Sequence, residues 1–345
     1  MSPCNNCISP VKEHTNTVWY AIGMDPLELS PQDRVIIFGS TGFVGSRLLP
    51  ELMKKNIRLR LFVRDRARVP DIAAVDKDIE IFQGDLLSGK GLAEALRGIH
   101  SAYYLVHSMG GQSVLRNVEY AEKDKFAARN VISAANKENI KRIIYLGGLG
   151  EAKDTLSEHL KSRAEVAAIL SSGRPSATVL RAAIIIGAGG ASFEMLRYLV
   201  ERLPVMVCPK WIDTRIQPIA LRDVLAYLSG CLLNPKTAGH SFDIGGPEIL
   251  TYREMMQRYA EARGLAKRTI FRVPFLTPLL SAYWVDLVSP VPSGIAHPLI
   301  EGLKNEVICS DNHINEFIPI EKTPFKEAVK IAFSEERDGP GITGF

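Results

Sequence analysis

The chain has 345 residues, of which 46% are hydrophobic and 23% charged, and its formal net charge is +4. This composition is ordinary for a globular protein, and the length allows one large domain or two smaller ones. The charge is too small and too dispersed to indicate a nucleic-acid partner. No stretch has the apolar length of a membrane span, and the five cysteines form no disulfide framework. We therefore expect a cytoplasmic protein without a transmembrane segment.

Residues 1–30 contain neither an apolar core nor a small-residue cleavage site, so they do not resemble a secretion signal. Cys4 and Cys7 form a Cys-x-x-Cys pair, but no second pair follows at zinc spacing. We expect no metal site there. Residues 1–30 are treated as a disordered N-terminal extension outside the fold.

The segment from Arg34 to Leu49 predicts a strand, a tight turn and the start of a helix. Its apolar run leads into Gly39, Gly42 and Gly45, and then into apolar residues at helical spacing. In a dinucleotide-binding turn, the first glycine permits the sharp turn, the second lets a pyrophosphate approach the main chain, and the third allows close helix packing. The helix N-terminus adds free N–H groups and a positive dipole end. A glycine-rich surface turn is the alternative, but it does not account for the flanking strand and helix. We assign to the cofactor Gly39, Ser40, Thr41, Gly42, Phe43, Val44 and Gly45.

A second predicted strand, residues 58–63, ends at Arg64, about 20 residues after the last glycine. In a fold of this type that position meets the adenosine ribose. An acidic residue there bonds the 2′-hydroxyl of NAD, whereas an arginine suits the 2′-phosphate of NADP. Arg64, with Arg66 and Arg68 nearby, therefore favours NADP(H). A shift of one residue would bring Asp65 to the ribose instead, which keeps NAD(H) possible.

Two further predicted strands end in polar residues. Residues 79–82 are followed by Asp85 and Leu86, and residues 102–106 by His107. The Asp85 carboxylate could accept a hydrogen bond from the adenine amino group, or it could cap the following helix. Because ligands of a parallel sheet bind at the carboxyl ends of its strands, we assign Asp85, Leu86, Val106 and His107 to the cofactor site.

More strands are expected at residues 141–146 and 177–181, and helices alternate with the strands throughout. Most of these strands are continuously apolar, as is typical of strands buried on both faces. With right-handed crossovers this pattern predicts an α/β fold, a Rossmann-type doubly wound parallel sheet. We expect residues 31–187 to form an NAD(P)-binding domain and residues 188–345 a smaller, mixed substrate or lid lobe. A strand near residues 240–245 is expected to return to the main sheet.

Within the second lobe, helices are expected at residues 193–202 and 222–228. Thr251 followed by Glu254 predicts a capping box that opens another helix. Residues 271–303 are apolar but interrupted by prolines, which exclude one long helix. Such a stretch suits a lobe core with a lid. The alternatives are an apolar substrate site or a peripheral membrane contact through residues 271–300.

Together these motifs resemble the short-chain dehydrogenase/reductase superfamily, in its atypical NmrA-like branch. The loop at residues 39–45 is similar to the nucleotide fingerprint of that branch. Several further segments resemble a narrower bacterial group, the YbjT-like NAD(P)H-binding proteins. These are residues 104–110, 145–150, 217–224, 244–248 and 287–292. The resemblance implies a Rossmann fold and bound NAD(P)H over nearly the whole chain, but it specifies no reaction. Members of this branch include an accessory subunit of respiratory complex I and photosystem assembly factors.

The active site departs from the pattern of the superfamily, whose working enzymes use a Ser after the fifth strand and a Tyr-x-x-x-Lys on the next helix. Here that strand ends in Gly147 and Gly148, while His159 and Arg163 stand at the spacing of the Tyr and Lys. Residues four apart share a helix face, so His159 could act as a general acid while Arg163 holds the ribose. The alternative is a surface pair on a helix that has lost its chemistry. Oxyanion support would come from Ser162, His107 or water.

Two functions therefore stay open. The first is an NADPH-dependent oxidoreductase acting on a small apolar carbonyl or quinone-like substrate, in which the cofactor carries the hydride chemistry. The second is a catalytically silent NADP(H)-binding regulator or assembly factor that acts on a partner protein. A third function, sugar-nucleotide epimerase chemistry, is less favoured because the Tyr is missing.

Overall fold

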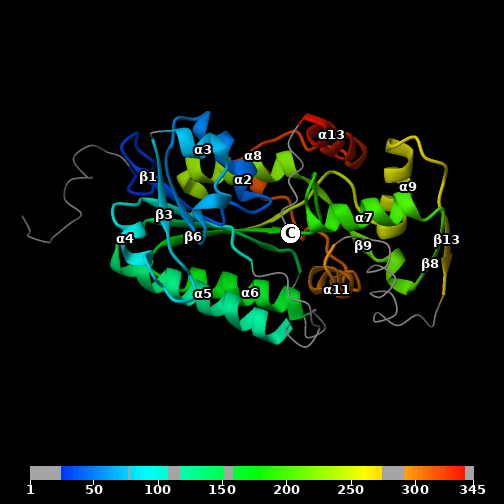
Figure 1. Ribbon diagram of the computed structural model, residues 1–345, viewed down its shortest axis with the longest axis horizontal. Coiled ribbons are helices and arrows are strands. Elements are labelled where there is room, and N and C mark those ends of the chain that lie inside the picture. The colour runs from blue at the N-terminus through cyan, green and yellow to red at the C-terminus, as the bar shows by residue number, and fades with distance from the viewer. Residues whose placement is uncertain (1–24, 77, 108–116, 151–157, 274–290, 339–345) are drawn as a thin grey trace, which may run out of the picture.

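The computed structural model describes residues 25–76, 78–107, 117–150, 158–273 and 291–338. Figure 1 shows an elongated molecule, with the main sheet and its helices at the left and a smaller lobe at the right. The structure places residues 25–30 against the first of these parts, because Leu29 packs on its core and the Pro26 carbonyl accepts a hydrogen bond from His100 Nε2 at 3.3 Å. The described chain thus joins the fold earlier than the sequence indicates.

The main sheet has seven strands, all parallel, in the order β11-β6-β5-β4-β1-β2-β3. The strands are β1 (Arg34–Phe38), β2 (Arg58–Val63), β3 (Ile79–Gln83), β4 (Ser101–Tyr104), β5 (Arg142–Gly148), β6 (Ser176–Ala182) and β11 (Ser241–Ile244). The order reverses between β1 and β4, which is the switch point where doubly wound sheets bind their ligands. The predicted fold is confirmed, including the return of the late strand beside β6.

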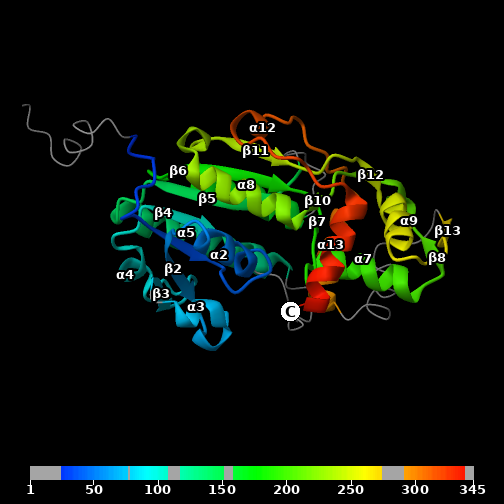
Figure 2. The same ribbon diagram turned by 90° about the horizontal axis from the view of Figure 1, so that it is seen from above.

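Helices cover both faces of the sheet (Figures 1 and 2). One face carries α2 (Gly45–Met53), α3 (Asp71–Val75) and α8 (Leu221–Leu233), and the other carries α4 (Leu92–Leu96), α5 (Asn117–Lys137) and α6 (Glu158–Ser171). Strand β1 shows why its sequence is continuously apolar. Val35 and Ile37 enter the core under α2 and α8, whereas Ile36 and Phe38 enter the core over α4 to α6, and all four are fully buried. A strand covered on both faces needs apolar side chains at every position.

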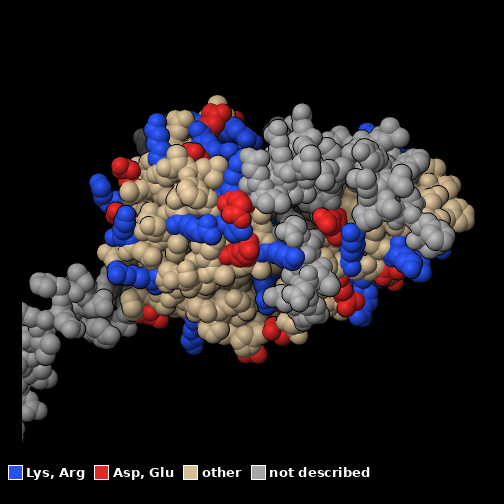
Figure 3. Space-filling view, turned by 90° about the horizontal axis from the view of Figure 1, so that it is seen from below, with Lys and Arg blue, Asp and Glu red and all other residues tan. Residues whose placement is uncertain are grey.

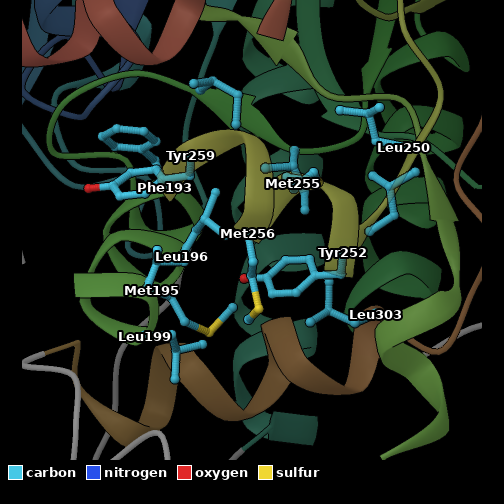
Figure 4. Close-up of a cluster of buried hydrophobic side chains, with 14 of the residues drawn as sticks. Phe193, Met195, Leu196, Leu199, Leu250, Tyr252, Met255, Met256, Tyr259 and Leu303 are labelled. Atoms are coloured by element: carbon cyan, nitrogen blue, oxygen red, sulfur yellow. The ribbon is translucent and has the colours of Figure 1, made fainter. Parts of the chain in front are cut away.

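The smaller lobe is built from α7 (Ala191–Arg202), α9 (Tyr252–Ala262), α11 (Ser293–Gly302) and α13 (Phe325–Asp338) around its own core. Figure 4 shows the rings of Phe193, Tyr252 and Tyr259 among the methionines Met195, Met255 and Met256. The predicted capping box is confirmed, because Thr251 and Glu254 each bond the other's backbone N–H at the start of α9. Methionine and aromatic side chains together make this core apolar and adaptable in shape.

Three short strand pairs and several short helices complete the described chain. The pairs are β7 (Ile185–Ile186) with β10 (Ile219–Ala220), β9 (Arg215–Ile216) with β12 (Leu250–Thr251), and β8 (Val205–Cys208) with β13 (Thr269–Arg272). The short helices are η1 (Arg66–Arg68), η3 (Lys210–Asp213), η4 (Pro235–Thr237) and α12 (Ile314–Phe317). Most of the apolar, proline-rich stretch, residues 274–290, lies outside the described residues. Across the part that is described, no helix combines the length and apolarity needed to cross a bilayer.

Candidate cofactor site and active site

The turn between β1 and α2 brings three backbone segments into close contact. Gly39 has a φ of +88°, and a Cβ there would lie 2.7 Å from the Leu105 carbonyl oxygen at the end of β4. At Gly45 a Cβ would lie only 2.1 Å from the Gly39 carbonyl oxygen. Gly42 is different, because it is exposed and its Cβ direction meets only the Gly39 oxygen, at 3.3 Å. The fold itself therefore requires the two outer glycines and leaves the middle one open to a ligand.

The rest of this turn offers hydrogen-bond donors. None of the backbone hydrogen bonds among the described residues uses the N–H groups of Phe43 or Val44, although Ser46 donates to the Gly42 carbonyl oxygen. Ser40 is fully buried, and its Oγ finds no hydrogen-bond partner in the described part of the chain. Thr41 is half-buried at the same turn. Donors at a helix N-terminus beside an open glycine fit the diphosphate of a dinucleotide.

The end of β2 separates the two candidates for the ribose. Arg64 is the first residue after the strand and is exposed, and the described residues give its guanidinium no partner. The Asp65 carboxylate accepts a hydrogen bond from the Ala67 N–H at 2.9 Å and thereby caps η1. Arg66 donates to the Ile81 carbonyl oxygen. Of these three side chains, Arg64 is the one left available for a ligand.

The structure at the end of β3 contradicts one of the two alternatives for Asp85. Asp85 accepts hydrogen bonds from the backbone N–H groups of Leu87 and Ser88, whereas the N-cap of α4 is Gly91. The alternative that Asp85 caps the following helix is therefore wrong, because the carboxylate closes a turn before that helix begins. Leu86 is largely buried, and Asn130 donates to its carbonyl oxygen. The contact with adenine stays a prediction.

The end of β4 carries a buried polar network that the sequence did not reveal. Val106 packs against the core, and the next residue, His107, bonds Asp124 of α5, with 2.8 Å between Nδ1 and Oδ2. Burial and the nearby Arg163 guanidinium lower the pKa of His107 to about 4, although the hydrogen bond to Asp124 acts in the opposite direction. The imidazole is therefore neutral at physiological pH and donates Nδ1–H to the carboxylate.

Arg163 lies next to this pair at the end of β5. Its Nη1 donates to the Leu146 carbonyl oxygen at 3.5 Å, and Tyr145 Oη donates to its backbone oxygen at 3.3 Å. Burial raises the pKa of Tyr145, so its hydroxyl stays protonated. Helix α6 packs closely here, because a Cβ at Gly148 would lie 3.1 Å from Leu160 Cδ2. Arg163 therefore places a cation beside the buried His107 and Asp124.

Two other predicted residues are on α6. His159 belongs to the first turn of that helix, but its side chain lies outside the described residues. Ser162 is buried, and its Oγ has no hydrogen-bond partner among the described residues. The structure therefore brings Arg163 close to His107 and leaves the role of His159 as a prediction. Sequence reasoning missed Asp124 because nothing in the sequence relates residues 107 and 124. The available signal for a functional residue was a carboxylate on the alanine-rich, packed face of α5.

We expect Gly42→Val to abolish NADPH binding while the protein still folds. The valine side chain would enter the space predicted for the diphosphate, so affinity should fall about a hundredfold or more by calorimetry. Gly45→Val is the contrasting variant. Its Cβ would collide with the Gly39 carbonyl, so we expect a clear loss of thermal stability. Normal NADPH affinity in folded Gly42→Val would contradict the assignment.

His107 should make the protein less stable in mild acid. Its pKa is about 4 in the folded protein and 6.5 ordinarily, so between these values the unfolded chain binds a proton that the folded chain does not. The free energy of unfolding therefore falls as the pH drops from 6.5 towards 4. His107→Gln should reduce this acid-induced loss by about 3 kcal/mol, measured by urea denaturation at neutral pH and at pH 4. Comparing each variant with itself removes the direct effect of the substitution, and identical losses would refute the burial of a neutral imidazole.

Comparison with known proteins adds independent support for the cofactor site. A family model described as NAD(P)H-binding matches residues 39–184, from the first glycine to the loop after β6. NADH dehydrogenase (ubiquinone) 1 alpha subcomplex subunit 9, mitochondrial, from Arabidopsis thaliana is 21% identical over 84% of this chain and 74% of its own length. A ceramide reductase from Caulobacter vibrioides is 27% identical over 70% of this chain and 73% of its own.

Solved structures show the same architecture. A nucleoside-diphosphate-sugar epimerase from Staphylococcus aureus matches with a TM-score of 0.68 at 17% identity, over 86% of this chain and 99% of that one. A short-chain dehydrogenase/reductase superfamily protein from Agrobacterium tumefaciens with bound NAD matches with a TM-score of 0.62 at 14% identity, over 88% and 97%. Sequence identities this low show only that the fold is shared. Residues 39–184 therefore form an NAD(P)H-binding domain, and the chain has the fold of the short-chain dehydrogenase/reductase superfamily.

Proposed function

We propose that the protein is an NADPH-dependent oxidoreductase of the atypical, NmrA-like branch, acting on an apolar carbonyl or quinone-like substrate. The observation that carries the proposal is the meeting of three features at the carboxyl ends of β1, β4 and β5. These are the open turn at Gly42, the buried pair of His107 and Asp124, and the Arg163 guanidinium. A buried polar network at the switch point of a doubly wound sheet is the kind of site at which such folds perform chemistry.

NADP(H) is the proposed cofactor because of the end of β2. Asp65 is already engaged as the cap of η1, so the residue that can reach a ribose substituent is Arg64. A planar guanidinium bonds a phosphate in two places, whereas an NAD-specific site would present a carboxylate to the ribose hydroxyls. Arg64 has no anionic partner among the described residues, and the 2′-phosphate of NADP(H) would be such a partner.

The roles of the remaining residues follow from their positions. If NADPH binds here it would supply the hydride, and the residues of this site would orient it. The N–H groups of the turn hold the diphosphate, and Arg163 anchors the nicotinamide ribose. His159 is proposed as the proton donor because it lies one helical turn before Arg163 and its ordinary pKa suits proton transfer near neutrality. His107 is neutral and donates its Nδ1–H to Asp124, so its Nε2 would accept a hydrogen bond from a hydroxyl group without adding charge beside the cofactor.

An apolar substrate agrees with the apolar character of the smaller lobe, whose core includes Leu149 and Ile184 from the segments that follow β5 and β6. The likeness to a ceramide reductase supports a lipid-like carbonyl compound over a polar sugar. The replacement of the usual Ser by Gly148 favours a second candidate function. In that case the protein is a catalytically silent NADP(H)-binding accessory factor, as the likeness to a subunit of a larger dehydrogenase suggests.

We expect Arg64→Ala to weaken NADPH at least about tenfold while leaving NADH nearly unchanged, because a charge-assisted bond to the 2′-phosphate is lost. Calorimetric titration with both cofactors measures the two affinities. Arg66→Ala is the matched control, since Arg66 is already bonded to the Ile81 carbonyl and should have little effect. Equal losses for NADPH and NADH would contradict the phosphate assignment.

Turnover distinguishes the two candidate functions. With a panel of apolar ketones, aldehydes and quinones, we expect NADPH oxidation whose kcat falls about a hundredfold in His159→Phe, with NADPH affinity retained. Glu165→Gln on the exposed side of the same helix is the control and should keep full activity. Tight NADPH binding with no turnover on any member of the panel would instead establish the accessory role.

A further inference from the structure

The strand pair β8–β13 lies at the far end of the smaller lobe (Figures 1 and 2). In the parallel register Phe271 stands beside Val207, and Ile270 stands beside Met206. Met206 and Cys208 are buried, so the opposite face of the pair is turned outward. That face carries Val205, Val207 and Phe271, which are 54%, 58% and 56% exposed. Three large apolar side chains half in solvent on one small sheet are unusual and indicate a contact surface.

The segment that leads into and through β13 is rich in basic residues. Residues 263–273 contain Arg263, Lys267, Arg268 and Arg272 but no acidic residue. Arg263 pairs with Glu201 and Arg272 with Asp213. Lys267 is exposed, and neither it nor Arg268 has an ion pair with any residue that the structure describes. The excess positive charge of the segment therefore lies with Lys267 and Arg268. In Figure 3 a small group of uncharged residues forms the outermost end of this lobe, with Lys, Arg, Asp and Glu groups nearby.

A recess of about 480 Å³ opens at these two cations. Its lining residues come from α9 and from the chain entering β13, and they are Arg253, Glu254, Gln257, Arg258, Lys267, Arg268 and Ile270. The Gln257 carboxamide holds the Arg268 backbone from both sides, donating to its carbonyl oxygen at 2.6 Å and accepting from its N–H at 3.0 Å. Arg268 Nε is buried and has no hydrogen-bond partner among the described residues. The recess is thus positioned by the fold and presents donors to an anion.

We propose that this end of the lobe, the β8–β13 tip formed by Val205, Val207, Phe271, Lys267 and Arg268, docks on an anionic lipid surface. The apolar side chains enter the boundary between head groups and acyl chains, and the two cations bond lipid phosphates. Amphipathic surfaces bind anionic membranes through this combination of buried apolar area and charge attraction. Three apolar side chains are too few for a standard protein interface, which buries about 800 Å² on each partner.

The test is flotation of the purified full-length protein with vesicles. One set is phosphatidylcholine alone, and the other contains roughly one phosphatidylglycerol in three lipids. We expect binding to the anionic vesicles, weakened by salt, and much less to the neutral ones. Lys267→Gln should reduce the partition coefficient about fivefold, and Phe271→Ser by a similar factor or more.

Matched controls lie at the other end of the molecule. Lys236→Gln removes one exposed cation from η4, and Leu233→Ser removes a 49%-exposed apolar side chain from the end of α8. Both should bind vesicles like the parent, and calorimetry with NADPH shows that each variant is folded. Absence of binding to anionic vesicles would overturn the proposal. It would also be overturned by equal losses in tip and control variants, or by a partner protein captured at the tip while vesicle binding is absent.

Discussion

The whole structure depends on the close approach of bare backbone at the end of β1. Gly39 lies against the Leu105 carbonyl at the end of β4, and Gly45 lies against the carbonyl of Gly39 itself. A residue with a Cβ does not fit at either position. Only glycine, which has no side chain, allows α2 to pack this closely on the sheet. The same contact leaves Gly42 and the first N–H groups of α2 facing outward. A packing constraint therefore leaves backbone donors free at this turn, as an anion site requires.

The second constraint is electrostatic. The fold brings together His107 from the segment after β4, Asp124 from α5 and Arg163 from α6. These side chains lie where water is largely excluded. Two opposite charges and a neutral ring form a stable group there, because the carboxylate orients the imidazole while the guanidinium disfavours a second positive charge. The neighbouring Tyr104 and Tyr145 have their pKa values raised by burial and remain uncharged. The charge of this group of side chains is thus defined by burial and by the Arg163 guanidinium.

The two lobes differ in the kinds of side chain that they contain. The sheet presents backbone donors and a small set of charged groups, whereas the smaller lobe presents methionine and aromatic side chains and little charge in its core. The outward face of β8 and β13 continues the apolar character of that lobe to its surface, beside an acid-free basic segment.

The sequence by itself determined the order of strands and helices, the glycine turn, the two-sided burial of β1 and the capping box at Thr251. All of these are local, because dihedral preferences, apolar runs and cap residues act within a few positions along the chain. Contacts across the fold were decided only by the tertiary structure. Arg142 begins a strand and would be expected in solvent, yet it is fully buried and donates to the Leu232 and Cys231 carbonyl oxygens at the end of α8. The pairing of His107 with Asp124 and the exposed face of β8 have the same origin. Each depends on which distant segments meet, and no local pattern carries that information.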